Sequence, residues 1–130
     1  MYRAVTENIE VMVHPAFSPE RSDPDSGEYF WTYTVRIRNL GQETVQLRSR
    51  HWEITDALGR VEHVRGAGVI GKQPVLKPGQ SFDYTSGCPL RTSQGVMVGS
   101  YQMVSADGRR IEVAIPAFSL DTPEIKRVLN

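Results

Sequence analysis

The sequence has 130 residues, and its 15 basic and 15 acidic residues cancel at neutral pH. This length suits a single domain, which would bury roughly 65–70% of the surface of its unfolded chain. A chain without net charge has no overall field that attracts nucleic acid or a membrane surface, so we expect neither as a partner. Cys88 is the only cysteine, and no apolar run suits a signal peptide or a membrane span. We therefore expect a cytoplasmic protein.

Alternating apolar and polar residues predict short β-strands from the N-terminal end onward. Residues 8–14 alternate, and we expect Pro15 to end that strand. Residues 16–28 hold two prolines, a glycine and five charges, which indicates a loop, and their acids do not follow the spacing of a calcium-binding loop. Residues 29–39 form the clearest strand, with large apolar side chains at odd positions and Arg36 and Arg38 among the even ones.

The next segment changes its alternation. Val45 and Leu47 are apolar at odd positions, whereas Trp52 and Ile54 are apolar at even positions. One extra residue near 49–51 would place both pairs on one face, so the pattern predicts a β-bulge there. Residues 39–42 supply a turn between this segment and residues 29–39, and a hairpin of 29–39 with 45–49 is one pairing that the pattern allows.

The remaining strands are expected at 60–65, around 82–84, at 96–105 and at 111–115. Asp107-Gly108 predicts the hairpin turn between the last two strands, and Pro116 is expected to close the final one. Seven or so short strands with no long helical pattern predict an antiparallel β-sandwich. We expect one domain over residues 1–130, with a core at about 3–120 and a tail, 121–130, that forms a short helical turn.

Three glycines, Gly66, Gly68 and Gly71, have the G-x-G-x-x-G spacing of dinucleotide-binding proteins. That motif places a helix after its last glycine. Here two prolines and a glycine follow within eight residues, which leaves no room for the helix. Two interpretations remain. We favour tight bends in a strand that crosses between sheets, and the alternative is an anion nest with Arg65 and Lys72 at its rim.

The arginines outnumber the lysines by 12 to 3. If that hairpin forms, Arg36, Arg38 and Arg48 share one outer face, and Arg50 joins them if the bulge lies after it. Like charges opposite one another cost stability, so such a cluster would suit an anionic partner. A solvated face with screened charges is the alternative, and we give it slightly more weight.

No catalytic or metal-binding set is visible in the sequence. His14, His51 and His63 lie on separate predicted strands, and none has zinc-ligand spacing with another histidine or with Cys88. Ser86 and Cys88 lack the signatures of hydrolase nucleophiles. We therefore expect no enzyme activity, no cofactor and no metal site.

Many fixed spacings in the chain resemble those of the bacterial ApaG family, also called CorD, from about residue 3 to residue 120. The resemblance rests on three groups of residues. The first is Trp31-x-Tyr33-x-Val35-x-Ile37-x-Asn39-x-Gly41 with Arg50-x-Trp52-x-Ile54-Thr55-Asp56-x-x-Gly59, and the second is Val64-x-Gly66-x-Gly68-Val69-x-Gly71-x-Gln73-Pro74-x-Leu76-x-Pro78-Gly79. The third consists of Tyr84-Thr85-Ser86-Gly87, Gly95-x-Met97-x-Gly99-x-Tyr101-x-Met103 and Ile115-Pro116-x-Phe118-x-Leu120.

The resemblance implies a fibronectin type III-like β-sandwich without an established enzyme activity. It also implies an association with cobalt and magnesium resistance or efflux. Members have genes beside that of a diadenosine tetraphosphate hydrolase, and related domains in eukaryotic proteins suggest an interaction module. Within the family, the glycine motif has been suggested as a pyrophosphate site, which would fall on Gly66, Gly68 and Gly71. We therefore expect a non-catalytic module that binds a partner protein of unknown identity. The alternative is a sensor that binds pyrophosphate or a dinucleoside polyphosphate at residues 66–71.

Overall fold

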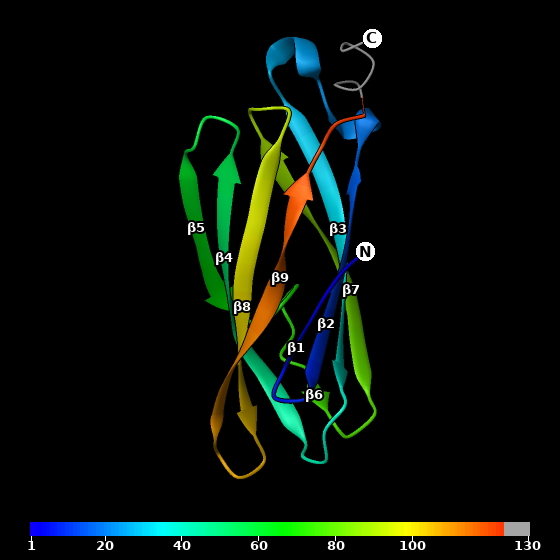
Figure 1. The fold of residues 1–130 in the computed structure, drawn as a ribbon, viewed down its shortest axis with the longest axis vertical. Helices are drawn as coiled ribbons and strands as arrows, with labels where there is room; N and C mark the ends of the chain where they lie inside the picture. The colour runs from blue at the N-terminus through cyan, green and yellow to red at the C-terminus, as the bar shows by residue number, and fades with distance from the viewer. Residues whose placement is uncertain (124–130) are drawn as a thin grey trace.

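The computed structural model describes residues 1–123, which form two antiparallel sheets packed face to face (Figure 1). The four-stranded sheet has the order β1-β2-β3-β7, and the five-stranded sheet joins β5-β4-β8-β9 with the short β6 paired to β4. The strands are β1 (Tyr2–Thr6), β2 (Ile9–Phe17), β3 (Tyr29–Asn39), β4 (Val45–Asp56), β5 (Val61–Ala67), β6 (Val75–Leu76), β7 (Ser81–Leu90), β8 (Gly95–Ser105) and β9 (Arg110–Leu120). The predicted antiparallel β-sandwich is confirmed.

The core lies between the two sheets and is filled by the alternate residues of each strand. On β3 the odd positions from Trp31 to Asn39 are buried, while Thr34, Arg36 and Arg38 are exposed, as the alternation predicts. The rings of Tyr33, Trp52 and Phe118 meet at the centre with centroid distances of 5.3 to 5.9 Å. Such tilted and edge-to-face aromatic contacts add stability beyond the burial of apolar area.

The predicted β-bulge is present in β4, slightly earlier than expected. The register between β4 and β8 shifts between Leu47 and Ser49, so Arg48 is the extra residue. The shift allows Leu47 and Trp52 to face the same core despite their different parity, and both are buried. The bulge also exposes the Arg48 backbone, whose carbonyl accepts hydrogen bonds from the Gly68 amide and the Gln73 side chain.

The hairpin considered for residues 29–39 and 45–49 does not form. β3 pairs with β2 and β7, whereas β4 pairs with β5, β6 and β8 in the opposite sheet. The turn after Asn39 therefore carries the chain across the sandwich instead of folding it back. Asn39, which is buried, stabilises this crossing, because its side-chain amide donates to the carbonyls of Glu43 and Leu76.

Two prolines expected to end strands lie inside them. β2 continues through Pro15 to Phe17, where it still pairs with β3 but has passed the end of its pairing with β1, so no strand lies on the β1 side to accept a hydrogen bond from residue 15. β9 continues through Pro116, which falls at a register shift between β8 and β9. A proline is tolerated at both kinds of position because neither requires its missing N–H.

The structure contains short elements that the sequence pattern did not predict, and one prediction falls on residues that the structure does not describe. Alternation did not identify β1, which pairs with β2 across a tight turn at Glu7 and Asn8, both with positive φ. The loop at 16–28 contains two short 3-10 turns, η1 (Pro19–Arg21) and η2 (Pro24–Ser26). The helical turn expected in the tail falls mostly on residues 124–130, which lie outside the described residues. Within residues 1–123, no helix is long and apolar enough to cross a membrane.

Candidate interaction groove

One side of the sandwich opens into a groove between two unpaired sheet edges. β5 pairs only with β4, and β7 pairs only with β3, among the strands of residues 1–123. Two adjoining hollows of about 520 and 280 Å³ lie between these edges and share Ile54, Glu62 and Pro89 in their walls. We call the combined depression the β5–β7 groove.

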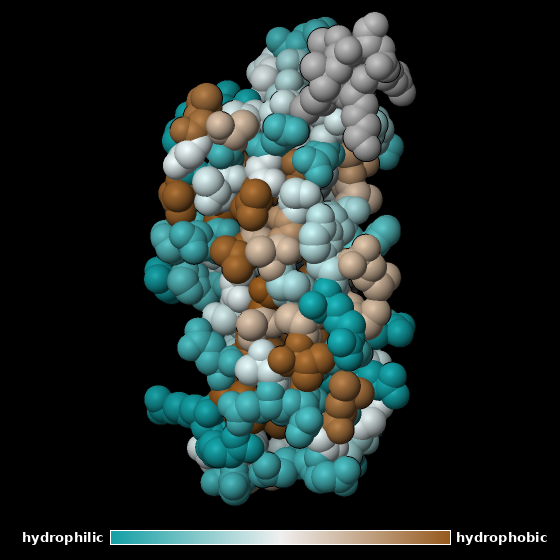
Figure 2. Space-filling model, in the orientation of Figure 1, coloured by the Kyte–Doolittle hydropathy of each residue, from teal (hydrophilic) through white to brown (hydrophobic). Residues whose placement is uncertain are grey.

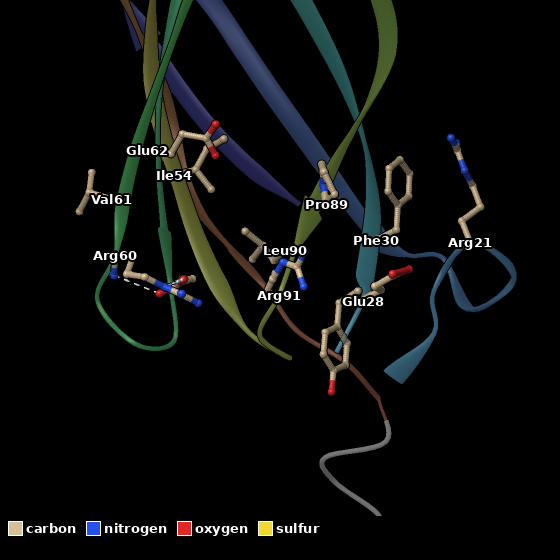
Figure 3. Close-up of a pocket in the computed structure, with 12 residues that line it drawn as sticks. Arg21, Glu28, Phe30, Ile54, Arg60, Val61, Glu62, Pro89, Leu90 and Arg91 are labelled. Atoms are coloured by element: carbon tan, nitrogen blue, oxygen red, sulfur yellow. Dashed lines mark hydrogen bonds and ion pairs between the residues drawn. The ribbon is translucent and has the colours of Figure 1, made fainter. Parts of the chain in front are cut away.

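The outer end of the groove combines apolar walls with charges of both signs. In Figure 3 Ile54 and Glu62 lie on one side of the cleft, and Pro89, Leu90 and Arg91 lie across from them. Tyr29 and Phe30 extend the apolar wall, and the Arg21 guanidinium lies 4.1 Å from the centre of the Phe30 ring. Such an arrangement offers stacking surfaces together with hydrogen-bonding groups.

Only part of the charge in this end of the groove is neutralised internally. Asp56 accepts a hydrogen bond of 2.7 Å from the Arg60 side chain and also caps the turn by binding the Leu58 amide. Burial is the largest single effect and raises the pKa of the Asp56 carboxyl group, but the hydrogen bonds from Arg60 and from the Leu58 amide together outweigh it, so the pKa is lowered. Within residues 1–123, the exposed side chains of Arg21, Glu28, Glu62 and Arg91 make no hydrogen bond or ion pair, so two acids and two bases remain for a ligand.

The inner end of the groove is more polar, and its walls include Tyr33, Arg50, Ser86 and Cys88. Burial raises the pKa of the Cys88 thiol to about 11, with a smaller contribution from the Glu62 carboxylate. The thiol is therefore protonated at neutral pH, which makes it a poor nucleophile. Cys88 therefore does not provide a reactive thiolate in this part of the groove.

Arg50 connects the groove to the glycine loop. Its Nη1 donates to the carbonyl oxygens of Ala67 and Gly68 at 3.2 and 2.9 Å. The guanidinium lies across Gly66, where a Cβ atom would be only 2.8 Å from Nη1. Gly66 is thus required by the approach of the Arg50 side chain, and the arginine in turn closes the loop.

The rest of the glycine motif forms a tight hairpin turn. Ile70 and Gly71 both have positive φ, and the backbones of Val69 and Lys72 exchange two hydrogen bonds of 2.8 and 2.9 Å across them. Gly68 also has positive φ, and a Cβ atom there would collide with the Lys72 carbonyl. No helix follows Gly71. The three glycines therefore serve close approaches and a turn, as the favoured interpretation held, but the segment joins β5 and β6 of one sheet and does not cross between sheets.

This geometry limits the alternative of an anion nest. The amides of Gly68, Val69 and Lys72 already donate to carbonyl oxygens within the protein. An anion nest needs several amides that point toward a shared space without internal acceptors. Arg65 projects from the outer face of β5, where it lies opposite His51, so its charge is not directed at the loop.

The arginine cluster expected on one outer face does not form, because the hairpin that it requires is absent. Arg36 and Arg38 lie on the four-stranded sheet, whereas Arg48 and Arg50 lie on β4 in the other sheet. Arg36 is already paired, since its side chain donates two hydrogen bonds to the Asp83 carboxylate at 3.0 and 3.1 Å. The four arginines therefore do not make a single basic patch.

The structure also brings together residues that the sequence left apart. Glu62, Leu90 and Arg91 line one groove although β5 and β7 belong to different sheets, and no local pattern indicates that the two edges face each other. His51 and His63, which were expected on separate strands with no shared site, lie within hydrogen-bonding distance on the outer face of the five-stranded sheet. The packing of the two sheets determines the first grouping, and cross-strand register determines the second; the sequence states neither.

The fold is a two-sheet antiparallel β-sandwich with open sheet edges. The family model of the ApaG domain matches residues 19–105. The chain is 62% identical to Protein ApaG of Bradyrhizobium sp. (strain ORS 278) and 58% identical to Protein ApaG of Xanthobacter autotrophicus, in both cases over 100% of each chain. The chain belongs to the ApaG family.

Solved structures agree with this assignment. A crystal structure of a Bordetella pertussis protein named ApaA has a TM-score of 0.87 and 50% sequence identity, covering 88% of this chain and 94% of the other. The C-terminal domain of wzt has a TM-score of 0.55 at 10% identity and covers 92% of this chain and 76% of the other, a likeness that concerns the fold alone. The sandwich fold is thus shared with proteins of low sequence identity as well as with the family.

Proposed function

We propose that this protein is a non-catalytic, cytoplasmic interaction module that binds an extended segment of a partner protein in the β5–β7 groove. The observation that carries the proposal is the pair of unpaired edge strands on either side of an open, partly apolar depression. An extended segment can add to a free edge through backbone hydrogen bonds, while pockets for its alternate side chains provide specificity.

The side chains at the groove suit this mode of binding. Leu90 and Ile54 offer apolar contacts, whereas Glu62 and Arg91 offer charges without internal partners among residues 1–123. Charges at the rim of an interface contribute more to the choice of partner than to raw affinity. Under this proposal the cobalt and magnesium association implied by the family resemblance acts through the partner rather than through a reaction of this chain.

The surface visible in Figure 2 favours localised recognition. Its apolar residues form separate brown patches among hydrophilic neighbours instead of one broad apolar area. The exposed apolar residues include Leu58 and Val61, which lie at the turn leading into β5 and therefore close to the groove edge. A continuous apolar face would indicate permanent association, whereas small patches beside a charged groove suit a reversible complex.

The test compares protein capture from cytosol by three tagged forms of the chain. The groove variant carries Glu62→Arg and Arg91→Glu, and a matched variant carries Arg38→Glu and Glu112→Arg on the outer faces of the two sheets. Both double substitutions preserve net charge and change exposed side chains, so the melting temperatures should remain close to that of the wild type. We expect the groove variant to lose its specific partner and the matched variant to keep it.

The opposite pattern would reject the proposal. If the matched variant loses the partner while the groove variant retains it, the outer faces carry the interaction, as the arginine hypothesis held. A third variant with Arg36→Glu, Arg38→Glu and Arg48→Glu tests that hypothesis directly. If the groove variant retains the partner, the β5–β7 groove is excluded as the binding site, whatever the other variants do.

A further inference from the structure

Two histidines meet on the outer face of the five-stranded sheet, away from the groove. Nε2 of His51 on β4 and Nδ1 of His63 on β5 are 3.0 Å apart, and the ring centroids are 5.2 Å apart at an interplanar angle of 28°. Both rings are accessible to solvent, so they can rotate without disturbing the core. This contact is not used by the proposed partner-binding function.

The strand register creates the contact. His51 lies opposite Arg65, and Glu53 lies opposite His63, so the two histidines are diagonal neighbours on adjacent antiparallel strands. Their side chains point outward because Trp52 and Ile54, which alternate with His51 on β4, are buried. Diagonal neighbours on one face are within reach of long or ring-shaped side chains.

Acidic groups surround the pair on the side facing β8 and β9. A shallow depression of about 420 Å³ is lined by His51, Glu53 and Glu112 together with small and apolar residues of β8 and β9. Arg65 lies opposite His51 in the pairing of β4 with β5, and its positively charged side chain faces solvent on the edge strand β5. Two carboxylates against one exposed arginine leave a local excess of negative charge that favours a bound cation.

We propose that His51 and His63 form a surface site for a divalent transition-metal ion that prefers tetragonal coordination, with copper(II) and nickel(II) as the fitting ions. Neutral imidazole nitrogen is a preferred ligand for these ions. On binding, the proton between the two rings leaves the shared contact, and the ring that carried it takes up a proton from solvent on its other nitrogen, so both imidazoles stay neutral. The ion then binds Nε2 of His51 and Nδ1 of His63.

The separation of the two nitrogens suits cis ligands of one ion. With metal–nitrogen bonds of about 2.0–2.1 Å, cis ligands at a right angle are about 2.9 Å apart, and the observed distance is 3.0 Å. In the observed pair the two nitrogens point at each other, because ring centroids 5.2 Å apart leave the contact nearly straight. Both rings therefore turn to aim their lone pairs at the ion.

Solvent completes the coordination. Among residues 1–123, no group of three or more histidine, cysteine, aspartate or glutamate side chains is arranged to hold an ion, so the protein supplies two ligands and water occupies the other positions. Glu53 adjoins both histidines in the sheet and acts as a hydrogen-bond acceptor for bound water. Such a site is open and exchanges its ion readily.

The test uses tag-free protein with copper(II) and nickel(II) chlorides in a non-coordinating buffer. Calorimetry measures affinity, and copper-induced broadening of amide signals locates the ion. The variants are His51→Gln and His63→Gln, and the control is His14→Gln, which changes the third histidine on the other sheet. We expect one ion per chain in the wild type and in the control, and an affinity at least about tenfold lower in each of the other variants.

Three outcomes would overturn the proposal. The first is an unchanged affinity in His51→Gln or in His63→Gln, because a two-ligand site requires both rings. The second is broadening centred away from β4 and β5, for example at the N-terminal amine. The third is a tenfold loss in His14→Gln. Far-UV circular dichroism of each variant confirms that the sandwich is intact, so a loss of binding reports the ligands themselves.

Discussion

The guanidinium of Arg50 lies across the backbone of Gly66 and holds the following residues of the loop through the carbonyls of Ala67 and Gly68. The arginine and the glycine are 16 positions apart but directly opposite each other in the β4–β5 ladder. Arg50 donates the hydrogen bonds, and Gly66, which has no side chain, leaves room for the guanidinium. The glycine spacing thus has a structural cause that requires no nucleotide.

This relationship predicts a coupled effect on stability. Gly66→Ala should lower the free energy of unfolding by about 1–3 kcal/mol, because its Cβ displaces the guanidinium from both carbonyls. In an Arg50→Ala background the same change should cost much less, since the space above Gly66 is then empty. Urea denaturation of the four forms in a double-mutant cycle measures the difference. Additive losses would show that the two residues act independently.

The glycine loop predicts a negative result with polyphosphates. Because the amides of Gly68, Val69 and Lys72 donate within the protein, pyrophosphate and diadenosine tetraphosphate should cause no saturable amide shifts at residues 65–72. Two-dimensional NMR titration measures this at constant ionic strength. Saturable shifts confined to that loop would instead support the nucleotide-sensor interpretation.

Cys88 should be unreactive in the folded protein. Its side chain is 3% exposed, and burial raises its pKa from 9.0 to about 11. At neutral pH the thiolate fraction is therefore about 100-fold lower than in the unfolded chain, and access is restricted as well. An aromatic disulfide reagent should react at least about 100-fold more slowly with native protein than with urea-unfolded protein. Complete reaction within the mixing time would contradict the burial of this thiol.

Tyr84 and Tyr101 predict a loss of stability at high pH. Burial raises the pKa of both phenols above the usual value of 10.0, and their hydroxyl groups share a hydrogen bond. Below pH 10 both are neutral in the folded and unfolded states. Above it the unfolded chain loses these protons first, so stability falls as pH rises, by up to about 1.4 kcal/mol per pH unit for each group.

Tyr84→Phe tests this assignment. At neutral pH it should lower the free energy of unfolding by about 1–3 kcal/mol, since the buried Tyr101 hydroxyl loses its partner. Above about pH 10 the decline in stability should become shallower, because one phenol no longer titrates. Urea titrations at about pH 8 and about pH 11 compare the variant with the wild type. An identical slope in the two proteins would mean that Tyr84 does not contribute to the alkaline transition.

Local pattern was sufficient for much of the fold. The odd-position apolar residues of β3 and the parity change in β4 identified a sandwich strand and a bulge, because side-chain alternation reports directly on which face is buried. Pro15 and Pro116 misled the prediction of strand ends, since the cost of a proline depends on whether a neighbouring strand needs its N–H. Whether a neighbouring strand requires a hydrogen bond at that position depends on how the strands pair, which the alternation of apolar and polar side chains does not reveal.

The groove required the tertiary structure. The turn after Asn39 looked like a hairpin, yet it carries the chain into the other sheet, and this choice decides whether Arg36 and Arg48 share a face. The same crossing leaves β5 and β7 as unpaired edges on one side of the sandwich. Glu62 and Arg91 then become neighbours in a groove although nothing in their local sequences distinguishes them from ordinary surface charges.

The most direct test of partner binding in the β5–β7 groove is site-specific photo-crosslinking in the native cytosol. A photoreactive phenylalanine derivative replaces Glu62, which lines the groove, or Arg38, which is exposed on the outer face of β3. We predict that the derivative at Glu62 captures one specific protein covalently and that the derivative at Arg38 does not. Capture from Arg38 with none from Glu62 would contradict the account.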